Sequence, residues 1–319
     1  MDVLKEVVSA ESRIRPWILR THVEFSPWLS EKTGAQVWLK AEHMQTTGSF
    51  KLRGAASKIL ALSPAEKARG VITASTGNHG AAVAYIAAKT GCNATIYLPE
   101  NTAPTKVDLI RMYGAEVSFR GQDSVETENH ARAMAAATDI PFISPYNDPL
   151  IVGGQGTIGL ELAQQVPDMD AVLVPVGGGG LIAGIAGYLK SVSPSIEIMG
   201  CQPRNSAVMY ESVKAGKILD IPSLPTLSDG TAGGLEEGSI TFELCQRYVD
   251  DYQLVSEEEI VAGLRFLLEK HYTMVEGAAA LSVASLLQNP GHYKGKTVVL
   301  ILCGRKMGLD TLKKVLQHH

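Results

Sequence analysis

Short apolar runs that look like β-strands alternate with helical stretches along most of this chain, and this alternation restricts the folds open to it. Strand-like runs occupy residues 36–42, 70–75, 93–99, 116–121, 171–176, 197–203 and 296–303, and helical patterns occupy residues 50–60, 80–91, 103–115 and 181–192. Continuous apolar runs are typical of strands buried on both faces, as in parallel sheets. The repeated strand–helix–strand order predicts an α/β fold with two open, mostly parallel, twisted sheets and flanking helices.

The same pattern suggests how the chain is divided. Residues 70–146 form a self-contained stretch rich in strand–helix–strand units, so we expect a small domain there. Residues 1–69 and 147–319 would then form a larger, discontinuous domain. Ligands of such sheets bind at the carboxyl ends of the strands. The loops that follow the strands are therefore where chemistry is expected.

Composition excludes several classes of function. The 319 residues are 45% hydrophobic and 19% charged, with a net charge of -4, which gives no electrostatic reason to expect nucleic acid or an anionic membrane as a partner. No apolar run reaches the roughly 18 residues that span a bilayer, and the N-terminus lacks a signal-peptide core, so we expect a cytoplasmic protein. The cysteines form no CxxC pair, which argues against a zinc site or a disulfide framework.

Glycine dominates the loop in "VLVPVGGGGLIAGIAGYL", where residues 177–180 separate an apolar strand from a helix. Without Cβ atoms the backbone amides can approach a ligand closely, next to the positive end of a helix dipole. No lysine of a nucleoside-triphosphate loop and no dinucleotide fingerprint is present. The loop therefore predicts a cradle for a small phosphate monoester, rather than a merely flexible turn.

A second loop, "ASTGNHGAAVAY", also follows a strand and opens a helix. Ser75, Thr76, Asn78 and His79 offer polar groups beside the helix N-terminus, which suits a carboxylate. An ordinary N-cap explains the same residues equally well, because Ser, Thr and Asn favour that position. This loop taken alone leaves both interpretations open.

Two further residues, Lys51 and Cys303, indicate a function only in combination with these loops. Lys51 lies where "TTGS" turns into a helix, and an amine held there beside Phe50 should lose its proton easily, as a Schiff-base lysine must. Cys303 follows a buried strand and taken alone is more simply a small core residue. A phosphate cradle, a reactive lysine and a carboxylate pocket together describe an amino-acid enzyme that uses pyridoxal 5'-phosphate.

The segments "TGSFKLRGA", "STGNHGAAVAY", "GGQGTIGLE" and "PVGGGGLIAGIA" closely resemble the fold-type II pyridoxal-phosphate enzymes of the serine/threonine dehydratase and serine racemase group. The similarity runs from about Arg13 to Met307 with the spacing of that family. It implies a fold like that of the tryptophan synthase β subunit, a homodimer, and binding of a small amino acid. No regulatory domain is expected after the last strand.

The resemblance also implies a role for each matching residue. Lys51 would hold the cofactor aldehyde covalently, and Thr76 would stand on the far face of the cofactor. The substrate carboxylate would meet Ser75, Thr76, Asn78 and His79. The remaining cofactor contacts would come from Phe50, Asn78, Tyr146, Gly177, Gly178, Gly179, Gly180, Leu181, Gly230, Glu276 and Cys303.

Several positions depart from the racemase pattern. Thr76 replaces a serine and is stiffer at χ1, which disfavours racemisation. Gln202 and Val208 stand where the racemase has carboxylate ligands, so we expect no metal site. Glu126 aligns with an arginine for a second substrate carboxylate, which argues against hydroxyaspartate. Arg305 and Lys306 replace the usual small residue and asparagine without an evident reason.

The expected reaction is β-elimination from a β-hydroxy amino acid, L-threonine or L-serine, giving a 2-oxo acid and ammonia. A neutral Cys303 beside the ring nitrogen would favour elimination over transamination. The alternatives are a dehydratase for phenylserine or a hydroxyectoine-derived compound, a serine racemase, a β-replacement synthase, or a silent binding protein. The stretch at residues 229–242 would shape the pocket that separates these substrates.

Overall fold

The computed structural model describes residues 1–317; residues 318 and 319 lie outside it. Its strands are β1 Val23–Phe25, β2 Gln36–Lys40, β3 Val71–Ala74, β4 Ala94–Leu98, β5 Glu116–Phe119, β6 Ala171–Pro175, β7 Glu197–Pro203, β8 Asp251–Val255 and β9 Thr297–Ile301. Its α-helices are α1 Val3–Ile14, α2 Pro27–Thr33, α3 Lys51–Ala61, α4 Pro64–Arg69, α5 Asn78–Lys89, α6 Pro104–Met112, α7 Ser124–Thr138, α8 Pro149–Gln165, α9 Gly180–Val192, α10 Val208–Ala215, α11 Ile240–Tyr248, α12 Glu257–Lys270, α13 Gly277–Gln288 and α14 Leu309–Gln317.

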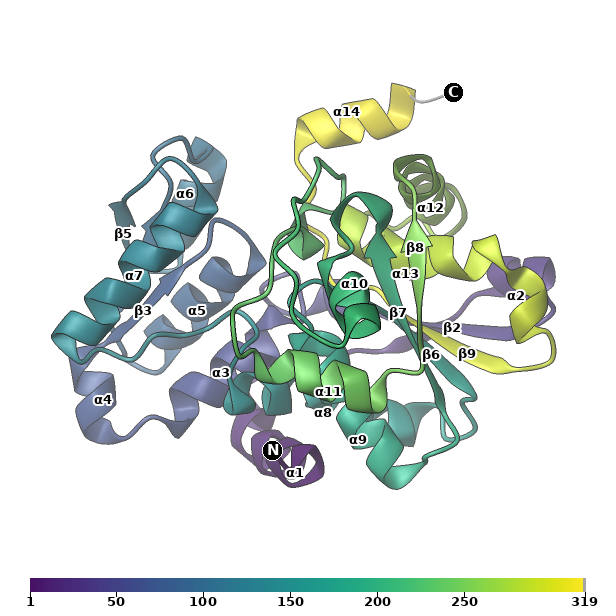
Figure 1. Cartoon of the computed structure of the whole chain (residues 1–319), viewed down its shortest axis with the longest axis horizontal. Helices are drawn as coiled ribbons and strands as arrows, with labels where there is room; N and C mark the ends of the chain where they lie inside the picture. The colour runs from purple at the N-terminus through teal and green to yellow at the C-terminus, as the bar shows by residue number, and fades with distance from the viewer. Residues whose placement is uncertain (318–319) are drawn as a thin grey trace.

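The strands form two sheets that are separate in space. A six-stranded sheet has the order β1-β2-β9-β6-β7-β8, and a three-stranded sheet has the order β3-β4-β5. All pairings are parallel except that of β1 with β2. In Figure 1 the small sheet lies at the left with α5, α6 and α7, and the large sheet lies at the right. The predicted α/β class with two mostly parallel sheets is confirmed, while the domain boundaries at residues 70 and 147 stay a prediction.

Every strand expected from an apolar run is present, but β1 and β8 were not expected. Both lie at the edges of the large sheet. The burial of β8 is partial over Tyr252–Leu254, and β1 has only three residues, two of them exposed. An edge strand has one unpaired side and more contact with water, so its sequence need not be a continuous apolar run. Apolar content therefore revealed the central strands and missed the edges.

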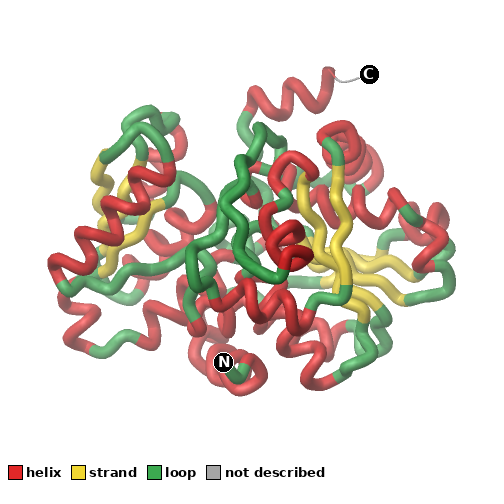
Figure 2. The backbone as a smooth tube through the Cα atoms, in the orientation of Figure 1, coloured by secondary structure: helices red, strands yellow, loops and turns green. Residues whose placement is uncertain are grey.

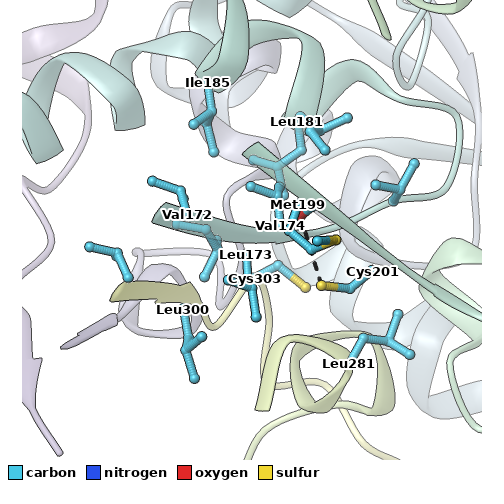
Figure 3. Close-up of a cluster of buried hydrophobic side chains, with 14 of the residues drawn as sticks. Val172, Leu173, Val174, Leu181, Ile185, Met199, Cys201, Leu281, Leu300 and Cys303 are labelled. Atoms are coloured by element: carbon cyan, nitrogen blue, oxygen red, sulfur yellow. Dashed lines mark hydrogen bonds between the residues drawn. The ribbon is translucent and has the colours of Figure 1, made fainter. Parts of the chain in front are cut away.

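The core of the large sheet is built on β6. Val172, Leu173 and Val174 are fully buried in one apolar cluster. Figure 3 shows them next to Leu300 of β9, with Leu281 of α13 on the other side of the strand from α9. Parallel strands buried on both faces give this pattern. The packing fixes the end of β6, and with it the glycine loop that follows.

A long irregular segment, residues 216–239, joins α10 to α11. It contains a short 3-10 turn, Asp229–Thr231, but otherwise lacks regular structure. Figure 2 shows it crossing the middle of the molecule in green, between the two sheets. Within residues 1–317, no helix combines the length and the apolar character that a membrane crossing requires.

Candidate active site

A cavity of about 640 Å³ opens where loops from the two sheets face one another. It is lined by the loop after β3, the glycine loop after β6, the start of α3 and the segment after β9. All of the site residues predicted from the sequence border it: Phe50, Lys51, Ser75, Thr76, Asn78, His79, Tyr146, Gly177, Gly178, Gly179, Gly180, Leu181, Gly230, Glu276 and Cys303. The fold therefore brings these residues together, and their individual roles stay proposals.

Lys51 is the first residue of α3, as its sequence context predicted. Its Nζ donates a hydrogen bond to the carbonyl oxygen of Pro145 at 2.8 Å and lies 5.2 Å from the centre of the Phe50 ring. Burial lowers the pKa of Lys51 to about 8, and the nearby Cys303 and Glu276 oppose that shift. The sequence argument gave the right direction, but loss of water is the main cause. A larger neutral fraction of the amine is therefore available near neutral pH than in an exposed lysine.

Backbone pairing places Cys303 beside the segment that precedes Lys51. The N–H of Phe50 donates to the carbonyl oxygen of Cys303 at 3.1 Å, and Ser49 forms an isolated bridge with Gly304. The segment before α3 and the segment after β9 therefore run side by side. The Cys303 thiol is buried, and burial raises its pKa well above the ordinary value, so it stays neutral.

A buried ion network centred on Arg53, two residues after Lys51, anchors α3. The Arg53 guanidinium is fully buried and donates to the carboxylates of Glu42 and Glu161 at 2.8–2.9 Å. Burial alone would raise the pKa of Glu161, but Arg53 and Lys40 lower it to about 2. A paired network of this kind is costly to break because it would leave a buried charge without a partner. It joins α3 to α8, and no sequence pattern announced it.

The glycine loop is held tightly by its neighbours. A Cβ on Gly178 would lie 2.5 Å from the Tyr146 ring, and one on Gly177 would lie 2.9 Å from Thr231. Gly179 has a φ of +83°, which L side chains rarely adopt. Helix α9 begins at Gly180, so its first amides have no carbonyl partner within the helix and can bind an anion. The loop is therefore a fixed structure, and its chemistry suits a phosphate.

Tyr146 is itself fixed by the irregular segment. Its hydroxyl oxygen accepts the N–H of Glu236 at 2.8 Å, while its ring covers Gly178. The Glu236 carboxylate accepts from Arg132 of α7 at 2.7 Å and from the amide of Asn147 at 2.9 Å. Residues of the small-sheet side, the irregular segment and the glycine loop thus form one connected set of contacts.

Asn78 and Glu276 are in direct contact at the cavity wall. The Asn78 amide nitrogen donates to both carboxylate oxygens of Glu276, at 3.0 and 2.8 Å. The amide oxygen of Asn78 is buried with no hydrogen-bond partner among residues 1–317. Burial raises the pKa of Glu276 to about 7, against the lowering effect of Asn78. Gly230 lies beside them, since a Cβ there would be 3.5 Å from the carboxylate.

The other residues of the second loop differ in orientation. Thr76 is partly accessible, and Ser75 Oγ accepts the N–H of Gly77 at 3.2 Å. His79 is buried, and its Nε2 donates to the carbonyl oxygen of Ile143 at 2.9 Å. Burial lowers the pKa of His79 to about 3. Its imidazole is therefore neutral and tied to the backbone, so it serves the loop as an anchor.

The sequence missed part of the cavity wall. Thr105, Lys106 and Leu109 of α6, and Pro145 with its carbonyl oxygen, also line it. Helix α6 was expected as a helix, but no local pattern shows which of its residues face another part of the chain. Only the arrangement of the two sheets places that surface over the cavity.

The structure separates Glu126 from the predicted site residues. Its side chain is exposed on the first turn of α7, where its carboxylate accepts the N–H of Gln122 at 2.9 Å. It is not one of the residues that line the cavity. The structure therefore shows no contact by which Glu126 could act on a substrate carboxylate, and its alignment with the racemase arginine stays a prediction.

At the racemase cation position the side chains are already satisfied. Gln202 is buried, and its amide oxygen accepts the N–H of Tyr210 at 2.8 Å. Val208 is buried at the start of α10. Over residues 1–317, no group of three or more His, Cys, Asp or Glu side chains could hold a metal ion.

The residues present fit pyridoxal phosphate. A buried amine with a lowered pKa suits the aldehyde, and the fixed glycine loop at a helix N-terminus suits the phosphate. The neutral Cys303 thiol can face a ring nitrogen without protonating it fully. The unpartnered amide oxygen of Asn78 indicates that the cavity lacks a polar group which a ligand would supply.

Comparison with known proteins agrees with this geometry. A family model described as "Pyridoxal-phosphate dependent enzyme" matches residues 14–304. An L-threonine ammonia-lyase from Thermotoga maritima is 39% identical over 316 residues, which cover 99% of this chain and 78% of that protein. The processed form of threonine deaminase isoform 2 from Solanum lycopersicum superposes with a TM-score of 0.94 at 33% identity, covering 98% of this chain and 92% of the other.

The structure of maize serine racemase is also similar, with a TM-score of 0.92 and 32% identity over 98% of this chain and 96% of that one. Dehydratases and racemases thus share this architecture, so overall shape does not separate the two activities. The chain belongs to the pyridoxal-phosphate dependent enzymes, in the fold-type II group of serine/threonine dehydratases and serine racemases that its motifs resemble.

Proposed function

We propose that this enzyme eliminates the β-hydroxyl group of L-threonine or L-serine and releases a 2-oxo acid and ammonia. The observation that carries the proposal is the convergence of the Lys51 amine, the glycine loop and the loop after β3 on one cavity. The Thermotoga maritima relative, an L-threonine ammonia-lyase, matches nearly the whole chain. The substrate is inferred from that relative, and the chemistry from the site.

Bound pyridoxal phosphate supplies an aldehyde for the substrate amine and a ring that draws electrons from Cα. Lys51 Nζ would hold the cofactor aldehyde and would serve as the base that removes the α-proton, because burial lowers its pKa to about 8. The amides of residues 177–181 hold the phosphate. Ser75, Thr76 and Asn78 orient the substrate carboxylate at the N-terminus of α5.

The neutral side chain of Cys303 favours elimination. An aspartate at that place would keep the ring nitrogen protonated and would make the ring draw electrons from Cα more strongly. A thiol whose pKa is raised well above its ordinary value carries no charge to do so. Prompt departure of the β-hydroxyl is then the easier route, and transamination is disfavoured.

Racemisation is a second candidate, which the maize serine racemase neighbour favours. It needs an acid on the face of Cα opposite Lys51, and Thr76 has a hydroxyl that lines the cavity. The β-branch of Thr76 restricts its χ1 more than serine would. We therefore rank racemisation below elimination, and retain phenylserine and hydroxyectoine-derived compounds as alternative substrates.

The test compares 2-oxo acid release from L-threonine, L-serine and phenylserine, with chiral analysis of the remaining amino acid. We expect oxo acid from threonine or serine in the wild-type enzyme and none in Lys51→Ala, a loss of at least about a thousandfold. The control Lys89→Ala changes an exposed lysine of α5 and should keep full activity. Full turnover by Lys51→Ala, or D-serine as the main product, would contradict the proposal.

We further propose a cytoplasmic location and a homodimer. All four cysteines are free and buried, which suits a reducing compartment. Dimer formation rests on the family resemblance, and the mass of the native protein in solution tests it.

A further inference from the structure

Lys306 is a cavity residue that the proposed reaction does not use. It lies in the segment between β9 and α14, and it lines the same cavity as Lys51. Its Nζ is buried and has no hydrogen-bond partner among residues 1–317. A buried ammonium without a partner is costly, so the position needs an explanation.

The nearby carboxylate does not satisfy this ammonium. Glu276 attracts Lys306 and opposes the fall in its pKa, but its oxygens accept from the Asn78 amide and from the backbone N–H of Lys306. Burial raises the pKa of Glu276 to about 7, so this group is only partly charged near neutral pH. Burial lowers the pKa of Lys306 to about 8, as expected where neutralisation is incomplete.

Two further cationic side chains line the cavity. Arg305, next in the chain, lines the cavity and lowers the pKa of Lys306 further. Lys106, an exposed residue of α6, lines the cavity from the small-sheet side. Figure 1 shows α6 on the left part of the molecule and the segment leading to α14 on the right part. The cations therefore come from both parts, and among residues 1–317 the acidic lining residues are Glu276 and the exposed Asp229.

The other anion sites of the cavity are already assigned. In the proposed function the glycine loop takes the cofactor phosphate and the loop after β3 takes the α-carboxylate of the substrate. Neither assignment uses Lys306, Arg305 or Lys106. Glu126, the one residue that argued against a second substrate anion, is exposed on α7 and does not reach the cavity.

We propose that Lys306, assisted by Arg305 and Lys106, determines specificity by binding a second anionic group at the end of the substrate side chain. The inference rests on the proposed function and extends its substrate class, beyond threonine and serine, to β-hydroxy amino acids that carry a carboxylate or a phosphate-like group. Lys306 contributes a charged hydrogen-bond donor, and Arg305 and Lys106 raise the local positive potential. The uncharged side chains of threonine and serine leave the Lys306 ammonium unsatisfied.

The test measures binding to the holoenzyme by calorimetry, so it is independent of turnover. L-Aspartate and L-asparagine have nearly the same shape, differ in charge, and lack a β-hydroxyl group. We expect the wild-type enzyme to bind L-aspartate roughly tenfold more tightly, the effect of one charged hydrogen bond. L-2-Amino-3-phosphonopropionate, whose phosphonate cannot be eliminated as phosphate can, shows whether the site prefers a carboxylate or a phosphate-like anion.

Variants assign the effect to Lys306. Lys306→Met should abolish the preference for L-aspartate, while Lys306→Arg should retain it. Lys32→Met removes one exposed positive charge from α2 and should leave the preference unchanged. If Lys306→Met does not fold, Lys306→Gln replaces it, because a neutral amide keeps similar length.

Two results would overturn the inference: equal binding of L-aspartate and L-asparagine by the wild-type enzyme, or an undiminished preference in the neutral Lys306 variants. A failure of the proposed function looks different. In that case no 2-oxo acid is released from any β-hydroxy amino acid, yet the aspartate preference and its loss in Lys306→Met would still be measurable.

Discussion

Two loops of the same kind meet at the cavity, and they are built in opposite ways. The loop between β6 and α9 consists of glycines, and it offers only its backbone. The loop between β3 and α5 offers the side chains of Ser75, Thr76 and Asn78. Both occupy the carboxyl end of a parallel strand next to a helix N-terminus, where anions bind well.

The packing around the two loops explains the contrast. Added Cβ atoms on Gly177, Gly178 and Gly180 would each come within 3.0 Å of a neighbour. A Cβ on Gly77, in the other loop, would meet nothing within 4 Å. The glycine loop is therefore packed closely against its neighbours, whereas the loop after β3 is open at Gly77. Cofactor affinity and substrate choice should accordingly respond to different substitutions.

The largest effect should come from a methyl group in the closed loop. Gly178→Ala places a Cβ 2.5 Å from the Tyr146 ring, and overpacking of this kind costs about 1–3 kcal/mol. We expect cofactor affinity to fall by about a hundredfold at the upper end, measured by titrating apoenzyme with pyridoxal phosphate. Gly77→Ala is the matched control and should change that affinity less than about threefold. Equal losses in both variants would remove the distinction between the loops.

A smaller effect is expected from the open loop. Thr76→Ala removes a hydroxyl at the cavity wall, and loss of one hydrogen bond to a charged substrate group costs about 1.5 kcal/mol. We expect kcat/KM for the amino acid to fall about tenfold while the cofactor titration stays unchanged. Thr76→Ser keeps the hydroxyl and should recover most of the activity. Weakened cofactor binding in Thr76→Ala would show that the two loops are not independent.

The smallest effect concerns how the rate of cofactor binding depends on pH, and it involves Lys51 rather than the substrate loop. An amine attacks an aldehyde only when neutral, and the pKa of Lys51 is lowered to about 8. Capture of pyridoxal phosphate by the apoenzyme should therefore speed up with rising pH and reach half its plateau near pH 8, about fivefold faster there than at pH 7. The absorbance change on mixing measures it. A midpoint near 10.4, the value for an exposed lysine, would mean that burial does not tune this amine.

Part of the site was accessible from the sequence because the loop after β3 and the glycine loop after β6 directly follow strands. The apolar runs marked the central strands, and the glycines and polar residues directly after them lie at the edge where ligands bind. Lys51 and Cys303 were harder, since a lysine at a helix start and a cysteine after a strand have ordinary explanations. They became convincing only together with the loops, and the structure places both on the same cavity.

The residues that escaped prediction depend on contacts between distant segments. The edge strands β1 and β8 lack a continuous apolar run, and Arg53 reaches Glu161 across 108 positions of the chain. Lys306 acquires a buried ammonium only because the segment after β9 packs against Glu276. Local sequence therefore specifies the order of strands and helices and the chemistry of each loop, because those depend on neighbours along the chain. Which loops share a cavity, and which charges remain there without partners, follows from long-range packing that no local pattern encodes.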